Sequence, residues 1–236
     1  MADDRRDELE ALLARQRAAF TASRPEPLSQ RKDRIKRAIA LVKDHGEEFA
    51  KAMSADFGSR SIQQSMLTDI AATVGAGNHA LKHMDAWAKT EKRKVQFPLG
   101  LLGAKAELRY EPKGVIGILS PWNFPVQLAF GPLMQVLAAG NRAMIKPSEF
   151  TEATSALMKE LIAKYYSPEE CVVVTGGPDI GAEFTKLAFD HILFTGATSV
   201  AKHVMRAAAD NLVPLTLELG GKSPVVLGRS ADMQKA

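Results

Sequence analysis

A regular alternation of apolar runs and helical patterns after Pro112 constrains the fold of this 236-residue chain more than any other feature. The apolar runs predict strands at 115–119, 143–146, 171–175, 191–194, 215–217 and 225–227. The stretches between them predict helices at 126–139, 151–165, 180–187 and 199–211. Strands that alternate with helices require crossover connections and a parallel sheet covered on both faces. We therefore predict an α/β fold with a doubly wound, Rossmann-like parallel sheet.

The first 94 residues carry a helical pattern instead, and we expect them to form a lead-in that packs on the sheet domain. Apolar side chains recur at near-helical spacing over residues 9–20, and Pro25 and Pro27 break that segment. Ser29 is a suitable N-cap for a second helix. The expected helical segments are 4–20, 29–55 with a pause at Gly46, and 61–89.

Residues 95–111 have a different pattern, which indicates a protruding β-hairpin arm. Apolar side chains surround Pro98, Gly100 and Gly103, and a second extended segment covers 106–110. This pattern predicts two extended segments joined by a glycine-containing turn. Because an isolated hairpin is at best marginally stable in water, we expect the arm to pack on a partner subunit or on another part of the same protein.

Composition places the chain among globular proteins, with 46% hydrophobic and 25% charged residues. Its longest apolar stretches fall far short of the roughly 20 residues that a membrane span needs. Residues 1–6 form a charged opening without an apolar signal region. The single cysteine, Cys171, excludes an internal disulfide and a thiolate metal cluster, which agrees with a reducing compartment. We therefore expect a cytoplasmic protein with no membrane partner.

The net charge of +4 and the isoelectric point near 9.1 are modest for a chain of this size. Basic residues gather at 31–37 and 89–94, but acidic side chains lie beside both runs. Solvated helix faces are the ordinary interpretation of such runs, and an anion-binding partner surface is the alternative. We expect no nucleic-acid partner. We also expect no metal site, because His79 and His83 have the i, i+4 spacing of metal ligands but no third ligand accompanies them.

The candidate ligand site lies where the predicted strands end, because ligands of such sheets bind beyond the carboxyl ends of the strands. Taken singly, these segments are ordinary turns. They are 120–124, 146–149, 175–178, 195–198 and 218–221. Asn123 carries an amide that can donate to a developing oxyanion, and Glu218 carries a carboxylate that can activate water. These are two of the three groups that acyl-thioester chemistry needs. The third is a cysteine thiolate, and no cysteine follows Glu218.

Four motifs at these strand ends resemble, in their order and spacing, those of the aldehyde dehydrogenase superfamily. The motifs are Ser-Pro-Trp-Asn-Phe-Pro at 120–125, Lys-Pro-Ser-Glu at 146–149, Phe-Thr-Gly at 194–196 and Leu-Glu-Leu-Gly-Gly-Lys-Ser-Pro at 217–224. The resemblance covers essentially the whole chain. The short N-terminal region and residues 109–115 look more like the class 3 and coniferyl aldehyde dehydrogenase branch than like the longer class 1 and 2 enzymes.

This resemblance implies an aldehyde dehydrogenase fold that is incomplete. Residues 1–94 would be the helical lead-in, 95–111 an oligomerisation arm, 112–217 the NAD-binding domain, and 218–236 the start of a catalytic domain, truncated before the catalytic cysteine. It also implies a homodimer for the full-length form.

The resemblance further implies oxidation of an aldehyde to a carboxylic acid through a cysteine thiohemiacetal and a thioester. Asn123 would hold the oxyanion, and Glu218 would activate the water that hydrolyses the thioester. Cys171 is not the expected nucleophile, because it begins a predicted strand at the edge opposite the ligand crevice. We therefore expect this chain alone to be inactive. A non-catalytic nucleotide-binding or interaction fragment is the alternative.

The cofactor implied by the resemblance is NAD. Lys146 and Glu149 would bind the adenosine ribose, where a carboxylate favours a free 2′-hydroxyl, although Lys146 leaves NADP open. A helix that starts at Thr198 or Ser199 would offer N–H groups to the pyrophosphate. Ala197 stands where many members have Ser or Asn, and Ala201 stands where many have Gly. The pyrophosphate contacts should therefore be weaker by roughly 1 kcal/mol per lost hydrogen bond. The implied cofactor-binding residues are Ser120, Pro121, Trp122, Lys146, Ser148, Glu149, Gly177, Thr195, Gly196, Ala197, Ala201 and Leu219.

Overall fold

The computed structural model describes residues 2–232 and 234, and its centre is a five-stranded parallel sheet. The strands are β3 (Val115–Leu119), β4 (Arg142–Lys146), β5 (Cys171–Val173), β6 (His191–Gly196) and β7 (Leu215–Leu219). Their order across the sheet is β5-β4-β3-β6-β7, and every neighbouring pair is parallel. The chain therefore moves outward from β3 in one direction and then returns to build the other half. This confirms the predicted doubly wound α/β sheet.

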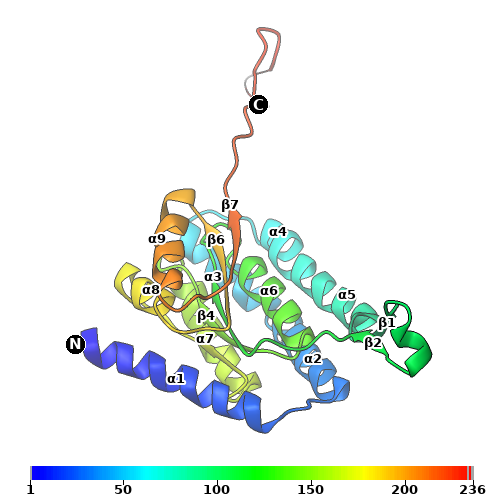
Figure 1. Ribbon diagram of the computed structural model, residues 1–236. Helices are drawn as coiled ribbons and strands as arrows, with labels where there is room; N and C mark the ends of the chain where they lie inside the picture. The colour runs from blue at the N-terminus through cyan, green and yellow to red at the C-terminus, as the bar shows by residue number, and fades with distance from the viewer. Residues whose placement is uncertain (1, 233, 235–236) are drawn as a thin grey trace.

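Helices cover both faces of the sheet, and each face has its own hydrophobic core (Figure 1). The helices are α1 (Ala2–Ala22), α2 (Leu28–Asp44), α3 (Gly46–Phe57), α4 (Ile62–Ser65), α5 (Ala72–Trp87), α6 (Gln127–Ala138), α7 (Glu152–Tyr165), α8 (Pro178–Thr185) and α9 (Thr198–Ala209). One core joins α2, α3, α5, α6 and α7 through residues such as Ile35, Phe49 and Phe130. The other joins α1, α8 and α9 through residues such as Leu13, Phe184 and Val204. Among the described residues, none of the helices combines the length and the hydropathy of a membrane-spanning segment.

The third helical stretch of the lead-in is continuous but contains a π-helix at Met66–Ala71 between α4 and α5. Gly77 does not break this stretch, because the missing side chain lets α5 approach its neighbours. A Cβ atom there would lie 2.2 Å from the Met134 sulfur and 2.6 Å from Ile39. The expected N-cap at Ser29 is wrong: α2 begins one residue earlier, at Leu28, with Pro27 in the cap position. Proline is suited to that place because its ring fixes φ near the observed −70° and because the helix needs no N–H donor there.

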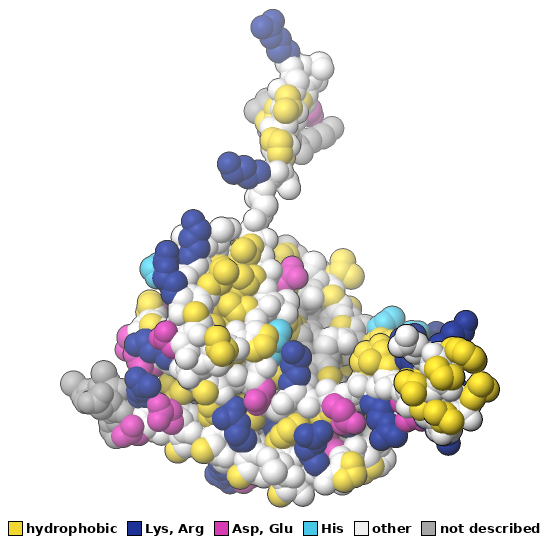
Figure 2. Space-filling view, in the orientation of Figure 1, with side chains coloured by type: hydrophobic (Ala, Val, Ile, Leu, Met, Phe, Trp, Pro, Cys, Tyr) yellow, Lys and Arg dark blue, Asp and Glu magenta, His cyan; other side chains and the backbone are white. Residues whose placement is uncertain are grey.

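The arm differs from its predicted form. Its strands are β1 (Glu91–Arg93) and β2 (Ala106–Leu108), which pair antiparallel, and residues 99–102 between them form a 3-10 helix. The expected first extended segment after residue 94 is therefore wrong, since Pro98 and two glycines favour a turn there. The arm protrudes from the body, and its tip carries Phe97, Leu101 and Leu102, each about 80% exposed. Figure 2 shows these apolar side chains gathered on it.

The predicted strand at 225–227 does not form. Beyond β7 the chain leaves the body of the protein (Figure 1), and Val225 and Val226 are exposed. A strand needs a neighbour to satisfy its backbone hydrogen bonds, and these residues have no partner strand within the described ranges 2–232 and 234.

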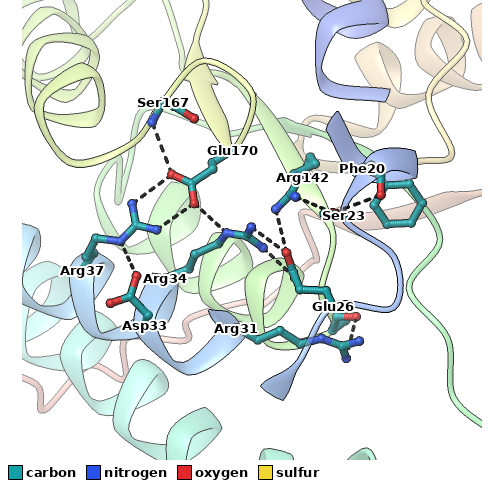
Figure 3. Close-up of polar contacts among 11 residues, drawn as sticks. Phe20, Ser23, Glu26, Arg31, Asp33, Arg34, Arg37, Arg142, Ser167 and Glu170 are labelled. Carbon is teal, nitrogen blue, oxygen red and sulfur yellow. Dashed lines mark hydrogen bonds and ion pairs between the residues drawn. The ribbon is translucent and has the colours of Figure 1, made fainter. Parts of the chain in front are cut away.

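A buried network of charged side chains joins the lead-in to the sheet (Figure 3). Arg34 of α2 forms ion pairs with Glu26 at 2.6 Å and with Glu170, just before β5, at 2.8 Å. Arg37 also contacts Glu170, at 2.8 Å, and Arg142 of β4 contacts Glu26 at 3.2 Å. For Arg34 the expected solvated helix face is wrong, because its side chain is only 7% exposed. Buried charges of this kind are tolerated only when paired.

The pKa of Glu170 reflects this pairing. Burial by itself raises the pKa of this carboxyl group, but hydrogen bonds from Arg37 and Arg34 and their positive charges outweigh that effect. The pKa of Glu170 consequently falls from its ordinary value of 4.5 to about 2. A carboxyl group with a depressed pKa stabilises the folded state above its unfolded pKa and loses that contribution as the pH falls through the folded value.

We expect Glu170→Gln to lower the free energy of unfolding by about 2 kcal/mol at pH 7, because two arginines lose their shared anion. The difference from the parent should shrink between about pH 4.5 and pH 2, where the parent carboxylate also becomes protonated. Urea unfolding at pH 7 and at pH 3 measures both values. Glu160→Gln, in an exposed pair with Lys164, is the control and should change little. An equal loss for Glu170→Gln at both pH values would contradict the assignment.

Candidate functional site

A cavity of about 860 Å³ lies at the carboxyl ends of β3, β4 and β6, between the sheet and helices α8 and α9. This is where the strand order reverses, since β4 and β6 flank β3 on opposite sides. Connections that diverge from neighbouring strands leave a crevice at such a point. Nine of the predicted site residues line the cavity: Ser120, Pro121, Trp122, Lys146, Ser148, Glu149, Thr195, Gly196 and Ala197.

Lys146 and Glu149 form the charged corner of the cavity. The ammonium group of Lys146 is almost fully buried, and it donates to the Pro147 carbonyl at 2.9 Å and to Glu149 Oε2 at 3.2 Å. The Glu149 side chain is 32% exposed. The pair therefore offers both a cationic donor and an anionic acceptor at one place, which suits a ligand with hydroxyl groups.

The loop between β4 and α7, which carries Lys146 and Glu149, is stabilised by a residue of the lead-in. Asp56 of α3 accepts from the backbone N–H groups of Ala153 and Thr154, both at 2.9 Å, and from the Thr154 hydroxyl at 2.6 Å. These N–H groups belong to the first turn of α7, where backbone N–H groups have no acceptor within the helix. The carboxylate thus acts as a cap for α7 although it lies nearly one hundred residues away in the sequence.

The amino end of α9 faces the same cavity. The helix starts at Thr198, one of the two predicted positions, and Ala197 occupies the N-cap without a side-chain hydrogen bond. Its first N–H groups therefore remain available to an anion. In the same cavity, the Ser120 Oγ atom is buried and has no hydrogen-bond partner among the described residues. A buried hydroxyl without a partner is costly unless a ligand or water completes it.

Five predicted site residues lie outside this cavity. Gly177, the N-cap of α8, lines an adjoining cavity of about 710 Å³ that shares Pro147, Ser148 and Glu149 with the first. Ala201 points into the hydrophobic core of α9 and is 2% exposed. The remaining three are Asn123, Glu218 and Leu219.

Asn123 and Glu218 lie at the ends of different strands. Asn123 follows β3 on an exposed loop, and Glu218 is exposed near the end of β7, in register with Thr195. No side-chain hydrogen bond or ion pair to another described residue occupies either group. Only β6 separates the two strands, and at about 4.8 Å per strand their axes are roughly 10 Å apart.

The sequence did not indicate the wall formed by α8 and α9. Gly181 and Ala182 of α8 and Val200 and His203 of α9 line the cavity. The only signal was the i, i+3 spacing of Val200 and His203, which is also the spacing of ordinary packing residues.

Cys171 lies at the amino end of β5 and belongs to a hydrophobic core, as predicted. Burial, and secondarily the negative charge of Glu170, raises the pKa of its thiol. A thiol of that kind is a poor nucleophile. Cys171 also lies outside the cavity that holds the site residues.

Comparison with known proteins identifies the family of this chain. The model of the aldehyde dehydrogenase family matches residues 1–236. The chain is 57% identical to a probable coniferyl aldehyde dehydrogenase of Caulobacter vibrioides, over 95% of this chain and 47% of that protein. It is 51% identical to a coniferyl aldehyde dehydrogenase of a Pseudomonas species, over 96% of this chain and 46% of that protein. The chain thus spans about half the length of the curated relatives it matches.

Solved structures give the same result. Substrate-bound AldH of Staphylococcus aureus superposes with a TM-score of 0.85 at 34% identity, over 95% of this chain and 48% of that one. The NAD+ complex of an aldehyde dehydrogenase from Bacillus cereus superposes with a TM-score of 0.79 at 27% identity, over 98% of this chain and 46% of that one. Since the family model matches from the first residue to the last, the chain belongs to the aldehyde dehydrogenase family.

Proposed function

We propose that this chain supplies the NAD site, the oxyanion donor and the general base of an enzyme that oxidises an aldehyde to a carboxylic acid. The observation that carries the proposal is the cavity at the strand-order reversal, where nine predicted residues meet around the unpartnered Ser120 hydroxyl. NAD, when bound, accepts a hydride from the substrate carbon. In this proposal residues 112–217 are the cofactor domain, with the lead-in and arm before it and the start of a catalytic domain after it.

The cavity residues suit a dinucleotide. Lys146 and Glu149 would bind the hydroxyl groups of a ribose, and the N–H groups at the start of α9 would bind the pyrophosphate. Ser120 Oγ supplies a further hydrogen-bonding group close to them. The small residues of α8 leave room for a flat ring.

Asn123 and Glu218 would act on the substrate. The Asn123 amide would donate to the oxygen that becomes negatively charged, and the Glu218 carboxylate would accept a proton from the attacking water. Both side chains are exposed at the carboxyl edge of the sheet and have no partner among the described residues. We propose an aromatic aldehyde of the coniferyl type as the substrate class, supported by the two relatives named for that activity.

We also propose that the full-length form is a homodimer, with the arm as part of the interface. The exposed apolar tip of the arm supports this, because a few large apolar side chains on a short hairpin gain stability only when another surface covers them.

We expect the 236-residue chain to bind NAD but to form no NADH when an aldehyde is added. Its single thiol, Cys171, is buried with a raised pKa and cannot serve as the nucleophile. Calorimetry measures the binding, and absorbance at the NADH band measures turnover. Absence of NAD binding to folded chain would sink the proposed function, and NADH formation would show that our account of the nucleophile is wrong.

Glu149→Gln should raise the affinity for NADP relative to NAD by about tenfold, which corresponds to about 1.4 kcal/mol. The carboxylate of Glu149 should repel a 2′-phosphate, and the amide should not. Calorimetric titration with both dinucleotides gives the ratio, with Glu47→Gln, exposed on α3 and outside both cavities, as the control. An unchanged ratio would mean that Glu149 does not face the ribose.

Gly181→Leu should fill the cavity and lower the affinity for NAD at least tenfold. A Cβ atom at Gly181 would have Lys146 Cε, at 4.0 Å, as its nearest neighbour, so the backbone need not move. Melting temperature should not fall, since leucine favours the helix by up to about 1 kcal/mol. Gly75→Leu, at an open helical position of α5, is the matched control and should leave NAD binding unchanged. Undiminished binding by Gly181→Leu would place the cofactor elsewhere.

A further inference from the structure

We propose that the buried ion pair between Arg60 and Asp69 is a clamp that positions the loop carrying Trp122 and Asn123. This inference rests on the proposed function, because it assigns a role to residues of the lead-in at the same site. Neither residue lines the cavity, so both are positioning residues that act through the loop.

Arg60 binds the loop at Asn123. Its Nη1 atom donates to the backbone carbonyl of Asn123 at 2.5 Å, and its Nη2 atom donates to Asp69 Oδ2 at 2.6 Å. The guanidinium group also lies over two aromatic rings, with its carbon 5.0 Å from the Phe57 centroid and 5.1 Å from the Phe124 centroid. Its side chain is 7% exposed. A planar group that donates to two partners and lies over two aromatic rings has little freedom to move.

Asp69 binds the end of the loop, where α6 begins. Its Oδ1 atom accepts from the backbone N–H groups of Val126 and Gln127, both at 3.2 Å. These N–H groups begin α6, where no partner is available within the helix. The side chain of Asp69 is fully buried. One ion pair therefore fixes both the carbonyl of Asn123 and the start of the helix that follows it.

The backbone around Asp69 supports a special role for this residue. Asp69 lies within the π-helix at Met66–Ala71, whereas the helices before and after it are α-helical. A π-turn changes the direction of the side chains that follow in a helix, and such turns are frequent at functional sites. Here the carboxylate it carries bridges Arg60 and the first residues of α6.

The contacts of Arg60 and Asp69 with the loop position its functional side chains but do not involve those side chains. Both clamp residues bind backbone atoms of the loop, so the amide of Asn123 stays free to point toward a substrate. Trp122 lines the cofactor cavity, and its ring packs against Phe57, the same ring that Arg60 covers, at a centroid distance of 6.0 Å. Displacing Arg60 should therefore shift Trp122 as well as Asn123.

The test uses the 236-residue chain with Trp87→Phe, which leaves Trp122 as the only tryptophan. In this background Arg60→Lys keeps the charge but cannot bridge Asn123 and Asp69 with a planar fork. We expect a shift of the Trp122 emission maximum, greater quenching of Trp122 by acrylamide, and NAD affinity reduced about tenfold by calorimetry. Asp69→Asn, which retains an acceptor for the α6 N–H groups, should produce smaller changes in the same direction.

Arg34→Lys is the matched control, since Arg34 is also 7% exposed in a buried ion pair but belongs to the network at the amino ends of β4 and β5. It should lower the melting temperature without altering Trp122 emission or NAD affinity. If Arg60→Lys changes emission and affinity no more than Arg34→Lys does, the ion pair is merely structural and the inference is wrong. Should Arg60→Lys fail to fold, Asp69→Asn decides by the same two readouts.

The outcomes for the two proposals are distinguishable. If the parent chain does not bind NAD, the proposed function fails, whereas the emission and quenching of Trp122 still show whether Arg60 positions the loop. If the parent binds NAD and Arg60→Lys changes neither the Trp122 emission nor the NAD affinity more than Arg34→Lys does, the clamp fails and the proposed function stands.

Discussion

The reversal of strand order at β3 is the constraint on which the rest of the structure depends. Right-handed crossovers carry the chain from β3 to β4 and β5, and the next connection must then return across the sheet to reach β6. The helices that follow β3 and β6 consequently leave in opposite directions, on opposite faces. Ser120 and Thr195 come to lie beside each other's strand ends although 75 positions separate them in the printed sequence, and the space between them is the cavity.

The lead-in is tied to this sheet by charge as well as by apolar packing. The network around Glu26, Arg34 and Glu170 is buried where it contacts the amino ends of β4 and β5. At the carboxyl ends, Asp56 and Asp69 satisfy the first N–H groups of α7 and α6. Buried ion pairs of this kind add little net stability over apolar packing, but they are strongly orienting, because a partner that moves leaves a charge unpaired.

Sequence reasoning succeeded where a repeating pattern reports burial. The strand at 115–119 was placed without error because apolar side chains face a core on both sides of a central parallel strand. The residues at the ends of such strands then followed from topology, which is why nine of them meet in one cavity. The strand at 91–93 was missed because its residues, Glu91, Lys92 and Arg93, are all charged and give no apolar signal.

Contacts between distant residues could not be found in this way. Arg34 looks like any helix-surface arginine until Glu170 is brought beside it across 136 positions. Arg60 and Asp69 bind backbone atoms of the loop after β3, and a backbone acceptor or donor leaves no trace in the identity of a residue. The run at 225–227 shows the opposite error, since an apolar sequence becomes a strand only where a neighbour is present to pair with it.

The carboxylate of Asp56 at the start of α7 has a consequence for how this protein can be divided. By the boundaries of its sheet, the part of the chain from β3 to β7 resembles a module that could be moved into another protein on its own. The loop bearing Lys146 and Glu149 nevertheless depends on a cap from α3, so a transplanted sheet domain would carry its binding residues on an unsupported loop. The smallest unit that preserves the site therefore includes the lead-in, and recombination or engineering at the edge of the sheet would separate the cavity from its support.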